Sequence, residues 1–173
     1  MEKNLILTGM MGVGKSTIGK MLAKKLKLNF ADIDKIIELR EKNTISEIFK
    51  KRGEDYFRKI EKKITINELK KKNLVVALGG GAFMSNTIRN EVKNSSVSFW
   101  LDVNLTILLN RLKNVSKRPL LNQTNLEETV KKIYSKRKKN YNEANFRVKC
   151  NSMSVEQIVN KIILLYENTR NKS

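Results

Sequence analysis

The sequence predicts an α/β fold in which helices cover both faces of a five-stranded parallel sheet, giving three layers. Two observations predict it. Strand-like apolar runs alternate with helical patterns along the whole chain, which is typical of a parallel sheet. One run, residues 74–78, is apolar throughout, as expected of a strand covered on both faces. The length of 173 residues suits one domain with one core, spanning residues 1–173.

The first half of the chain opens with a short apolar run, residues 5–8, which ends at a glycine and indicates a buried strand. Residues 15–26 carry apolar side chains at helical spacing. A second short strand is expected at 29–33. Helical patterns follow it, and they lie at about residues 36–39, 46–51 and 54–72.

The second half continues the alternation, with strands expected at 74–78, 97–101 and 146–150 and a helix between the first two of them. A helix at 104–112 precedes a polar loop at 113–125, and a basic helix follows at 127–143. Ser154 to Gln157 has the form of a capping box, which predicts the start of the last helix. The polar tail from residue 168 is expected to fray.

The composition is strongly basic, with 36 Lys and Arg against 17 Asp and Glu, and it contains no histidine. A net charge of +19 could serve nucleic-acid binding, but only nine of the basic residues are arginine and the lysines are scattered. A uniformly Lys-rich surface without a specific nucleic-acid partner is the favoured interpretation. Acid–base chemistry without histidine must use carboxylates, Lys, Tyr or water.

Two sequence features bear on location. No apolar run is long enough for a transmembrane helix, and the N-terminus lacks the pattern of a secretory signal, so no membrane association is expected. Cys150 is the single cysteine and cannot form an intramolecular disulfide. We therefore expect a monomeric protein of the cytoplasm, with Cys150 as a small buried residue and Trp100 as part of the core.

The segment from Gly9 to Ser16, GMMGVGKS, matches the phosphate-loop pattern G-x-x-x-x-G-K-[ST] at every fixed position. It lies between an expected strand and an expected helix, where the motif requires it. Glycines let the backbone turn tightly and direct its N–H groups at phosphate oxygens. Lys15 should contact the β and γ phosphates, and the Ser16 hydroxyl should ligate Mg²⁺.

Two carboxylates, Asp32 and Asp34, follow the second expected strand. Residues just past the carboxyl ends of parallel strands line the ligand crevice. In an extended segment the two side chains would point the same way, so that one could hold Mg²⁺ or its waters and the other could orient an acceptor hydroxyl. Alternatively, Asp34 caps the helix that follows.

Further motifs, combined with the phosphate loop, resemble the shikimate kinase family over residues 5 to about 148. They are the Asp32-x-Asp34 pair, Phe57-Arg58 with Glu61, Gly79-Gly80-Gly81, Arg118-Pro119-Leu120-Leu121, and Arg137 with Tyr141. Many kinases share the phosphate loop, whereas this combination is far more specific. The resemblance implies a P-loop kinase architecture with an acceptor-binding subdomain at about 34–62 and a lid at about 113–125.

The family transfers the γ-phosphoryl group of MgATP to the 3-hydroxyl of shikimate, in aromatic amino acid biosynthesis. The resemblance therefore implies ATP and shikimate as substrates and Mg²⁺ as cofactor. It assigns nucleotide binding to Gly12, Val13, Gly14, Lys15, Ser16, Thr17, Arg111 and Arg118. It assigns acceptor binding to Asp34, Arg58, Gly79, Gly80, Gly81 and Arg137. Lys15, Asp34 and Arg118 would act in catalysis, with Ser16 and Asp32 at the metal.

Elementary chemistry supports these assignments, because arginine can form two parallel hydrogen bonds to a carboxylate and lysine cannot. Arg58, Arg118 and Arg137 are notable in a chain with 27 lysines and nine arginines. For each of them the alternative is a solvated surface charge. For the glycine triplet the alternative is a tight turn, against a close approach of the backbone to a ligand.

Two other functions remain as competing hypotheses. One is a related P-loop kinase that acts on another small acceptor, such as gluconate. The other is nucleic-acid binding through the positive charge, which salt would weaken sharply if the contacts were non-specific. Whether Asp34 removes the acceptor's proton or only orients the hydroxyl stays open.

Overall fold

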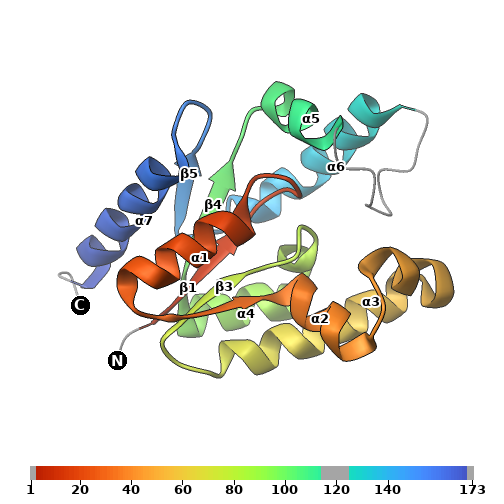
Figure 1. Cartoon of the computed structure of the whole chain (residues 1–173), viewed down its shortest axis with the longest axis horizontal. Coiled ribbons are helices and arrows are strands. Elements are labelled where there is room, and N and C mark those ends of the chain that lie inside the picture. Colours follow the sequence, from red (N-terminus) through yellow and green to blue (C-terminus); the bar gives the residue numbers. More distant parts are fainter. Residues whose placement is uncertain (1–2, 114–124, 171–173) are drawn as a thin grey trace.

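The computed structural model describes residues 3–113 and 125–170, and a parallel sheet of five strands lies at its centre (Figure 1). The strands are β1 Asn4–Thr8, β2 Asn29–Asp32, β3 Leu74–Ala77, β4 Ser96–Asp102 and β5 Phe146–Lys149. Their order is β2-β3-β1-β4-β5, with every neighbouring pair parallel. The predicted five-stranded parallel sheet is therefore confirmed, with β1 at its centre.

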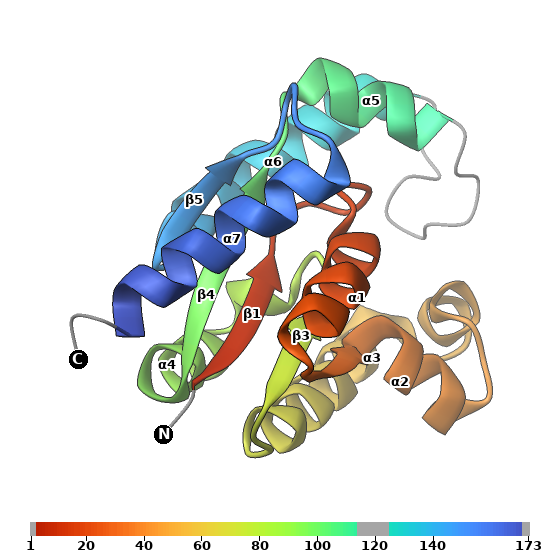
Figure 2. The ribbon, with the colours of Figure 1, turned by 60° about the vertical axis from the view of Figure 1, so that its left-hand side comes forward.

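Seven α-helices surround this sheet within the described residues. They are α1 Lys15–Leu26, α2 Ile33–Glu41, α3 Ile45–Leu69, α4 Asn86–Ser95, α5 Leu105–Lys113, α6 Leu126–Tyr141 and α7 Val155–Arg170, with a short 3₁₀ turn η1 at Ala82–Met84. α1 and α7 lie together on one face of the sheet, and α4 and α6 lie on the other (Figures 1 and 2). The predicted three layers are confirmed, and α4 supplies the helix that was expected between β3 and β4.

The three middle strands lie inside the core, which apolar side chains of the surrounding helices complete. All five residues of β1 and all seven of β4 are buried, as the central position of these strands requires. Trp100 and Cys150 are each 1% exposed, so both are core residues as expected. Burial, with Asp102 nearby, raises the pKa of the Cys150 thiol to about 11, which leaves it protonated and inert at neutral pH.

Local capping chemistry sets several helix boundaries. At α7, Ser154 Oγ accepts from the N–H of Gln157 at 3.2 Å, and Gln157 Oε1 accepts from the N–H of Ser154 at 2.8 Å. The predicted capping box is therefore confirmed. α7 then continues to Arg170, so the prediction that the tail frays from residue 168 was wrong for residues 168–170.

The two helices predicted at 46–51 and 54–72 form one element, α3, that is interrupted at Gly53. Gly53 has φ 77° and ψ 171°, which only glycine adopts without strain, so the helix axis changes direction there. The second part of α3 begins with Glu54 and carries Arg58 and Glu61 on successive turns. In the described part of the chain, no helix is long and apolar enough to cross a membrane.

Candidate active site

The turn after β1 forms the phosphate loop at the carboxyl end of the sheet. Gly12 and Gly14 have φ of 80° and 98°, a region that residues with a side chain rarely adopt. Gly14 is also the residue that precedes α1, so the N-terminal end of this helix points at the loop. The structure thus has the backbone conformation that the motif predicted.

Lys15 closes this loop from inside. Its Nζ donates to the carbonyl oxygens of Gly9 at 2.8 Å and Met10 at 2.9 Å, and the residue is only 9% exposed. A buried ammonium group held by two carbonyls is positioned, not mobile in solvent. It supplies a fixed positive charge beside the backbone amides, which suits the binding of phosphate oxygens.

Ser16 and Asp32 meet where β1 and β2 end. Ser16 Oγ donates to Asp32 Oδ2 at 2.5 Å, while Asp32 Oδ1 accepts from the N–H of Lys35 at 3.3 Å. Hydroxyl and carboxylate oxygens are ligands that Mg²⁺ prefers. The described residues contain no cluster of three or more His, Cys, Asp or Glu that could hold a metal alone.

Asp32 is therefore the residue that caps α2, and Asp34 lies in the first turn of that helix. The prediction that Asp32 and Asp34 point the same way from an extended segment was wrong, because the cap ends β2 at Asp32 and Ile33 is already helical. The alternative that Asp34 is the cap was also wrong. Asp34 is instead directed towards the segment after β3, where its Oδ1 lies 2.7 Å from the point at which a side chain on Gly79 would begin.

α5 covers the other side of the phosphate loop. A Cβ on Gly12 would lie 3.0 Å from Leu112 Cδ2 and 3.4 Å from Leu108 Cδ1, so a larger residue there would press on both side chains. Arg111, one turn from Leu108, donates from Nη1 to the carbonyl of Val13 at 3.3 Å. The structure therefore brings Arg111 to the phosphate loop.

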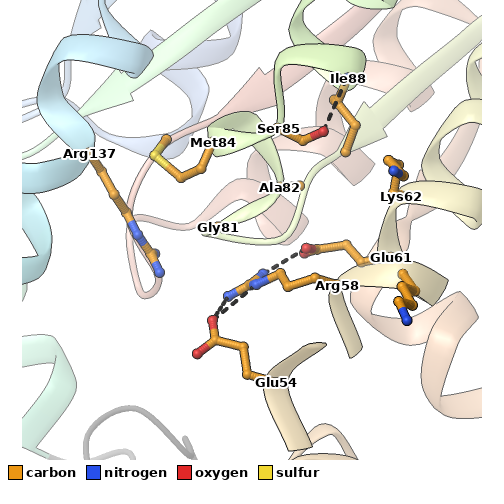
Figure 3. A pocket seen from close by; sticks show the side chains of 11 residues that line it. Glu54, Arg58, Glu61, Lys62, Gly81, Ala82, Met84, Ser85, Ile88 and Arg137 are labelled. Atoms are coloured by element: carbon orange, nitrogen blue, oxygen red, sulfur yellow. Dashed lines mark hydrogen bonds and ion pairs between the residues drawn. The ribbon is translucent and has the colours of Figure 1, made fainter. Parts of the chain in front are cut away.

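A cavity of about 390 Å³ lies between α3, α6 and the segment that follows β3 (Figure 3). Its charged lining comprises Glu54, Arg58, Lys59, Glu61, Lys62 and Arg137, and its apolar wall is formed by Ala82, Met84 and Ile88. Arg58 enters from α3 and Arg137 from α6, with Gly81 between them (Figure 3). Two guanidinium groups that face one small cavity are suited to hold a carboxylate.

Arg58 is held by two carboxylates of its own helix. It donates from Nη1 to Glu61 at 2.6 Å, and from Nε and Nη2 to Glu54 at 3.1 and 3.0 Å. Glu61 is 2% exposed. Burial raises the pKa of Glu61, although Arg58 opposes this by stabilising its charged form. The carboxylates of Glu54 and Glu61 together fix the guanidinium of Arg58 against the backbone of Gly81.

Arg137 is also buried, at 8% exposure, so the alternative of a solvated surface charge is wrong. Its Nη1 donates to the carbonyl of Gly80 at 2.9 Å. Tyr141, one turn later in α6, donates its hydroxyl to the same carbonyl. Burial raises the pKa of Tyr141, so this hydroxyl keeps its proton and remains a donor.

The comparisons with known proteins agree with this geometry. The family model described as shikimate kinase matches residues 11–167. The chain belongs to the shikimate kinase family. Two relatives named shikimate kinase, from Sulfurihydrogenibium sp. and Persephonella marina, are 43% and 42% identical over 161 residues, which are 93% of this chain and 96% and 97% of theirs.

Solved structures of the shikimate kinase family have the same fold. The shikimate kinase from Acinetobacter baumannii in complex with shikimate has a TM-score of 0.92 and 33% identity, covering 96% of this chain and 94% of that one. A gluconokinase from Sinorhizobium meliloti, at a TM-score of 0.65 and 15% identity over 99% of this chain and 98% of that one, shares the fold alone. The comparisons thus favour the first of the two kinase hypotheses.

One part of the site expected for a shikimate kinase lies outside the described residues. Arg118 and residues 114–124 of the predicted lid, at about 113–125, belong to it. The remaining site residues lie around the carboxyl edge of the sheet. Lys15, Ser16 and Arg111 gather at the phosphate loop, while Asp34, Arg58 and Arg137 gather around the glycine triplet.

Sequence reasoning gave no role to Glu61 or Tyr141, although both were part of the resemblance. Each is buried and bonded to the site. For Glu61, the signal was its spacing of three residues from Arg58 on a helix. For Tyr141, it was the spacing of four residues from Arg137. Such spacings place side chains on one helix face, but they do not say that this face is buried.

Proposed function

We propose that this protein transfers the γ-phosphoryl group of MgATP to the 3-hydroxyl of shikimate, giving shikimate 3-phosphate and ADP. The observation that carries the proposal is the meeting of Arg58 and Arg137 at one cavity, beside the glycine triplet. Membership of the shikimate kinase family and the overall likeness to a relative in complex with shikimate support the same acceptor.

We assign the shikimate carboxylate to Arg58 and Arg137. Each guanidinium can offer two parallel N–H groups, and both are charged at any relevant pH. Arg58 is already fixed by Glu61 and Glu54, so little side-chain freedom is lost when the carboxylate binds. Backbone N–H groups of Gly79, Gly80 and Gly81 complete the acceptor contacts.

The acceptor hydroxyl is assigned to Asp34. Its carboxylate lies at Gly79, on the side of the triplet next to the cavity wall formed by Glu61. A carboxylate there can accept a hydrogen bond from the attacking hydroxyl and orient it towards the γ-phosphoryl group. Residues of about 34–62, which run from α2 into the second part of α3, would form the acceptor-binding subdomain.

The nucleotide is assigned to the phosphate loop. Amides of Gly12, Val13, Gly14, Ser16 and Thr17, with the ammonium of Lys15, would bind the phosphates, and Arg111 would lie near the adenine. Mg²⁺ would be held by Ser16, with Asp32 acting through water, and would neutralise charge on the phosphates. Arg118 of the lid is assigned to the transferring group, where a cation stabilises the transition state and a closed lid excludes water.

The protein is proposed to act as a monomer in the cytoplasm, with no specific nucleic-acid partner. A kinase function explains why these positions hold arginine, because Arg58 and Arg137 line the cavity and Arg111 bonds to the phosphate loop. The excess positive charge needs no further role, because scattered exposed lysines do not form a base-reading surface.

The experiment is a coupled ADP-release assay with purified protein and MgATP. The acceptor panel contains shikimate, quinate, gluconate and nucleoside monophosphates. Shikimate is expected to exceed every other acceptor by about 100-fold in kcat/KM, because an acceptor of another shape cannot place its carboxylate at the two arginines and its hydroxyl at Asp34 together, and a misplacement near 1 Å costs about that factor. Comparable turnover of gluconate would refute the proposed substrate.

Arg58→Ala tests the carboxylate assignment. Loss of a partly buried, bidentate partner should raise the KM for shikimate by roughly 100-fold and leave the KM for ATP nearly unchanged. Arg52→Ala is the matched control, because Arg52 lies on the same helix, is exposed and stacks on Tyr56 away from the cavity. Unchanged shikimate turnover by Arg58→Ala would remove Arg58 from the site.

A further inference from the structure

The carbonyl oxygen of Gly80 is a shared acceptor for two side chains of α6. Arg137 Nη1 donates to it at 2.9 Å, and the hydroxyl of Tyr141 donates to it as well. A carbonyl oxygen has two lone pairs, so both are used. The two donors are four residues apart and therefore lie on the same face of the helix.

The two donors differ in freedom. Tyr141 is 0% exposed, and its ring stacks on Trp100 of β4 with 5.9 Å between centroids. Its hydroxyl also lies 3.9 Å from the sulfur of Met10 in the phosphate loop. Packing on every side thus holds the tyrosine in one place, whereas Arg137 ends in a guanidinium with several donors on a long side chain, which lines the cavity.

This difference matters because the proposed function requires Arg137 to donate hydrogen bonds to the substrate carboxylate. If Arg137 turns its guanidinium to the carboxylate of shikimate, the Gly80 carbonyl loses a partner. Gly80 is partly buried, so a carbonyl there that loses a partner costs free energy, and that cost would oppose substrate binding. A second donor that stays in place removes the cost.

We infer that Tyr141 is a positioning residue for the acceptor: its hydroxyl keeps the Gly80 carbonyl bonded and thereby releases Arg137 to bind the substrate carboxylate. The inference rests on the proposed function and extends it to a residue with no contact to the reacting atoms. Tyr141 acts through Gly80 and Arg137, and its effect belongs to acceptor binding.

The same hydrogen bond also orients a peptide group. In a trans peptide the carbonyl and the following N–H point in opposite directions, and the described residues contain no cis peptide. Holding the Gly80 carbonyl towards α6 therefore directs the N–H of Gly81 away from α6. Gly81 lines the cavity and touches the guanidinium of Arg58. Tyr141 thus fixes the backbone between the two arginines.

Tyr141→Phe removes only the hydroxyl and keeps the ring in its packing. The KM for shikimate is expected to rise roughly 2- to 10-fold, the range for one net hydrogen bond, while kcat and the KM for ATP stay within about twofold. The fluorescence of Trp100, the single tryptophan of the chain, gives the dissociation constant for shikimate independently of turnover. It should rise by the same factor.

Tyr134→Phe is the matched control. Tyr134 lies on the same helix and donates its hydroxyl to Asp102 at 3.0 Å, away from Gly80. The variant loses a comparable hydrogen bond, so both variants should melt a few degrees below the wild type, by about 2–4 °C. Only Tyr141→Phe should change shikimate binding. Equal changes in the two variants would overturn the inference, because helix loosening would then explain them.

A double-mutant cycle with Arg137→Ala tests the link between the two side chains. Without Arg137 there is no guanidinium to release, so adding Tyr141→Phe should not weaken shikimate binding further, as measured by Trp100 fluorescence. The same factor in both backgrounds would overturn the inference. If the wild type phosphorylates shikimate and Tyr141→Phe binds shikimate equally well, the inference about Tyr141 fails and the proposed function stands. If the wild type does not phosphorylate shikimate, the proposed function fails as well.

Discussion

Gly81→Ala is the perturbation that tests the position of Arg58 most directly. A Cβ on Gly81 would lie 2.6, 2.7 and 2.8 Å from Nη1, Nη2 and Cζ of Arg58. The backbone of Gly81 has φ −104° and ψ −11°, which alanine adopts without strain. The new methyl group therefore acts only by pushing the guanidinium.

The size of that push follows from the distances. Ordinary contact begins near 3.4 Å, so the guanidinium must retreat by roughly 0.6 to 0.8 Å to relieve these contacts. Arg58 cannot simply rotate away, because Glu61 holds Nη1 at 2.6 Å and Glu54 holds Nε and Nη2. A misplacement approaching 1 Å in a positioned group costs up to about 100-fold, so we expect a loss of roughly 10- to 100-fold in kcat/KM for shikimate.

The assay is steady-state ADP release with each substrate varied in turn, accompanied by a melting curve. The loss should appear in the KM for shikimate, with the KM for ATP and the melting temperature nearly unchanged. In an Arg58→Ala background, Gly81→Ala should have little further effect, because the group that it displaces is gone. An unchanged KM for shikimate in the single variant would refute the assignment of Arg58 to the substrate carboxylate.

Two further predictions concern stability. Glu61→Gln removes a carboxyl group whose pKa is raised by burial. Such a group stabilises the fold at pH values below its ordinary pKa of 4.5, and this stabilisation is lost as the pH rises through the raised pKa. The melting temperature of the wild type relative to the variant should therefore fall from acidic to neutral pH. A difference that grows with pH in differential scanning fluorimetry would contradict this sign. Gly19→Ala places a Cβ 2.5 Å from Phe30 Cε2 and 3.3 Å from Leu7 Cδ1. Overpacking there should cost about 1–3 kcal/mol, whereas the higher helix propensity of alanine contributes about 1 kcal/mol of stability. The melting temperature should therefore fall by roughly 3 °C. A more stable variant would show that Phe30 yields without cost.

Much of the nucleotide side of the site was predictable, because its chemistry is local in the sequence. A phosphate loop needs a strand, a glycine-containing turn and a helix in immediate succession, and residues 5–26 supply all three. The conformations of Gly12 and Gly14 and the burial of Lys15 follow from this arrangement. Distant segments add only the pairing of β1 with β3 and β4 and the cover of α5 over the loop.

The acceptor side depends on contacts between distant segments, and there the residue pattern alone was weaker. Arg58 and Arg137 stood out because arginine is scarce beside lysine, but their meeting at one cavity comes from the packing of α3 and α6 around the segment after β3. Glu61 lies in a basic stretch and has the local pattern of a solvated residue. Only the fold turns it inward to Gly79.

The error at Asp32 and Asp34 has a local cause. The prediction extended β2 to residue 33, and in an extended segment alternate side chains share a face. Asp32 instead accepts the N–H of Lys35 and begins a helix, which rotates Asp34 away from it. Side-chain capping competes with continuation of the strand, and the early start of α2 separates a carboxylate at Ser16 from a carboxylate at Gly79.

The glycine triplet decides between its two interpretations. A tight turn that needs glycine would show a positive φ, and the described glycines with positive φ are Gly9, Gly12, Gly14 and Gly53, which leaves the triplet out. What each of its members lacks is space. A Cβ would meet carboxylate oxygens of Asp34 and Glu61 at Gly79, the amide nitrogen of Met11 at Gly80, and the guanidinium of Arg58 at Gly81.

A side chain at any of these three positions would therefore meet polar groups from four other parts of the structure: α2, α3, α6 and the phosphate loop. A side chain at any one of them would separate a proposed acceptor-binding group from its neighbours. The triplet is the surface on which the carboxylate, the guanidinium and the nucleotide loop approach one another, so its sequence is explained by close packing of the site and not by the turn.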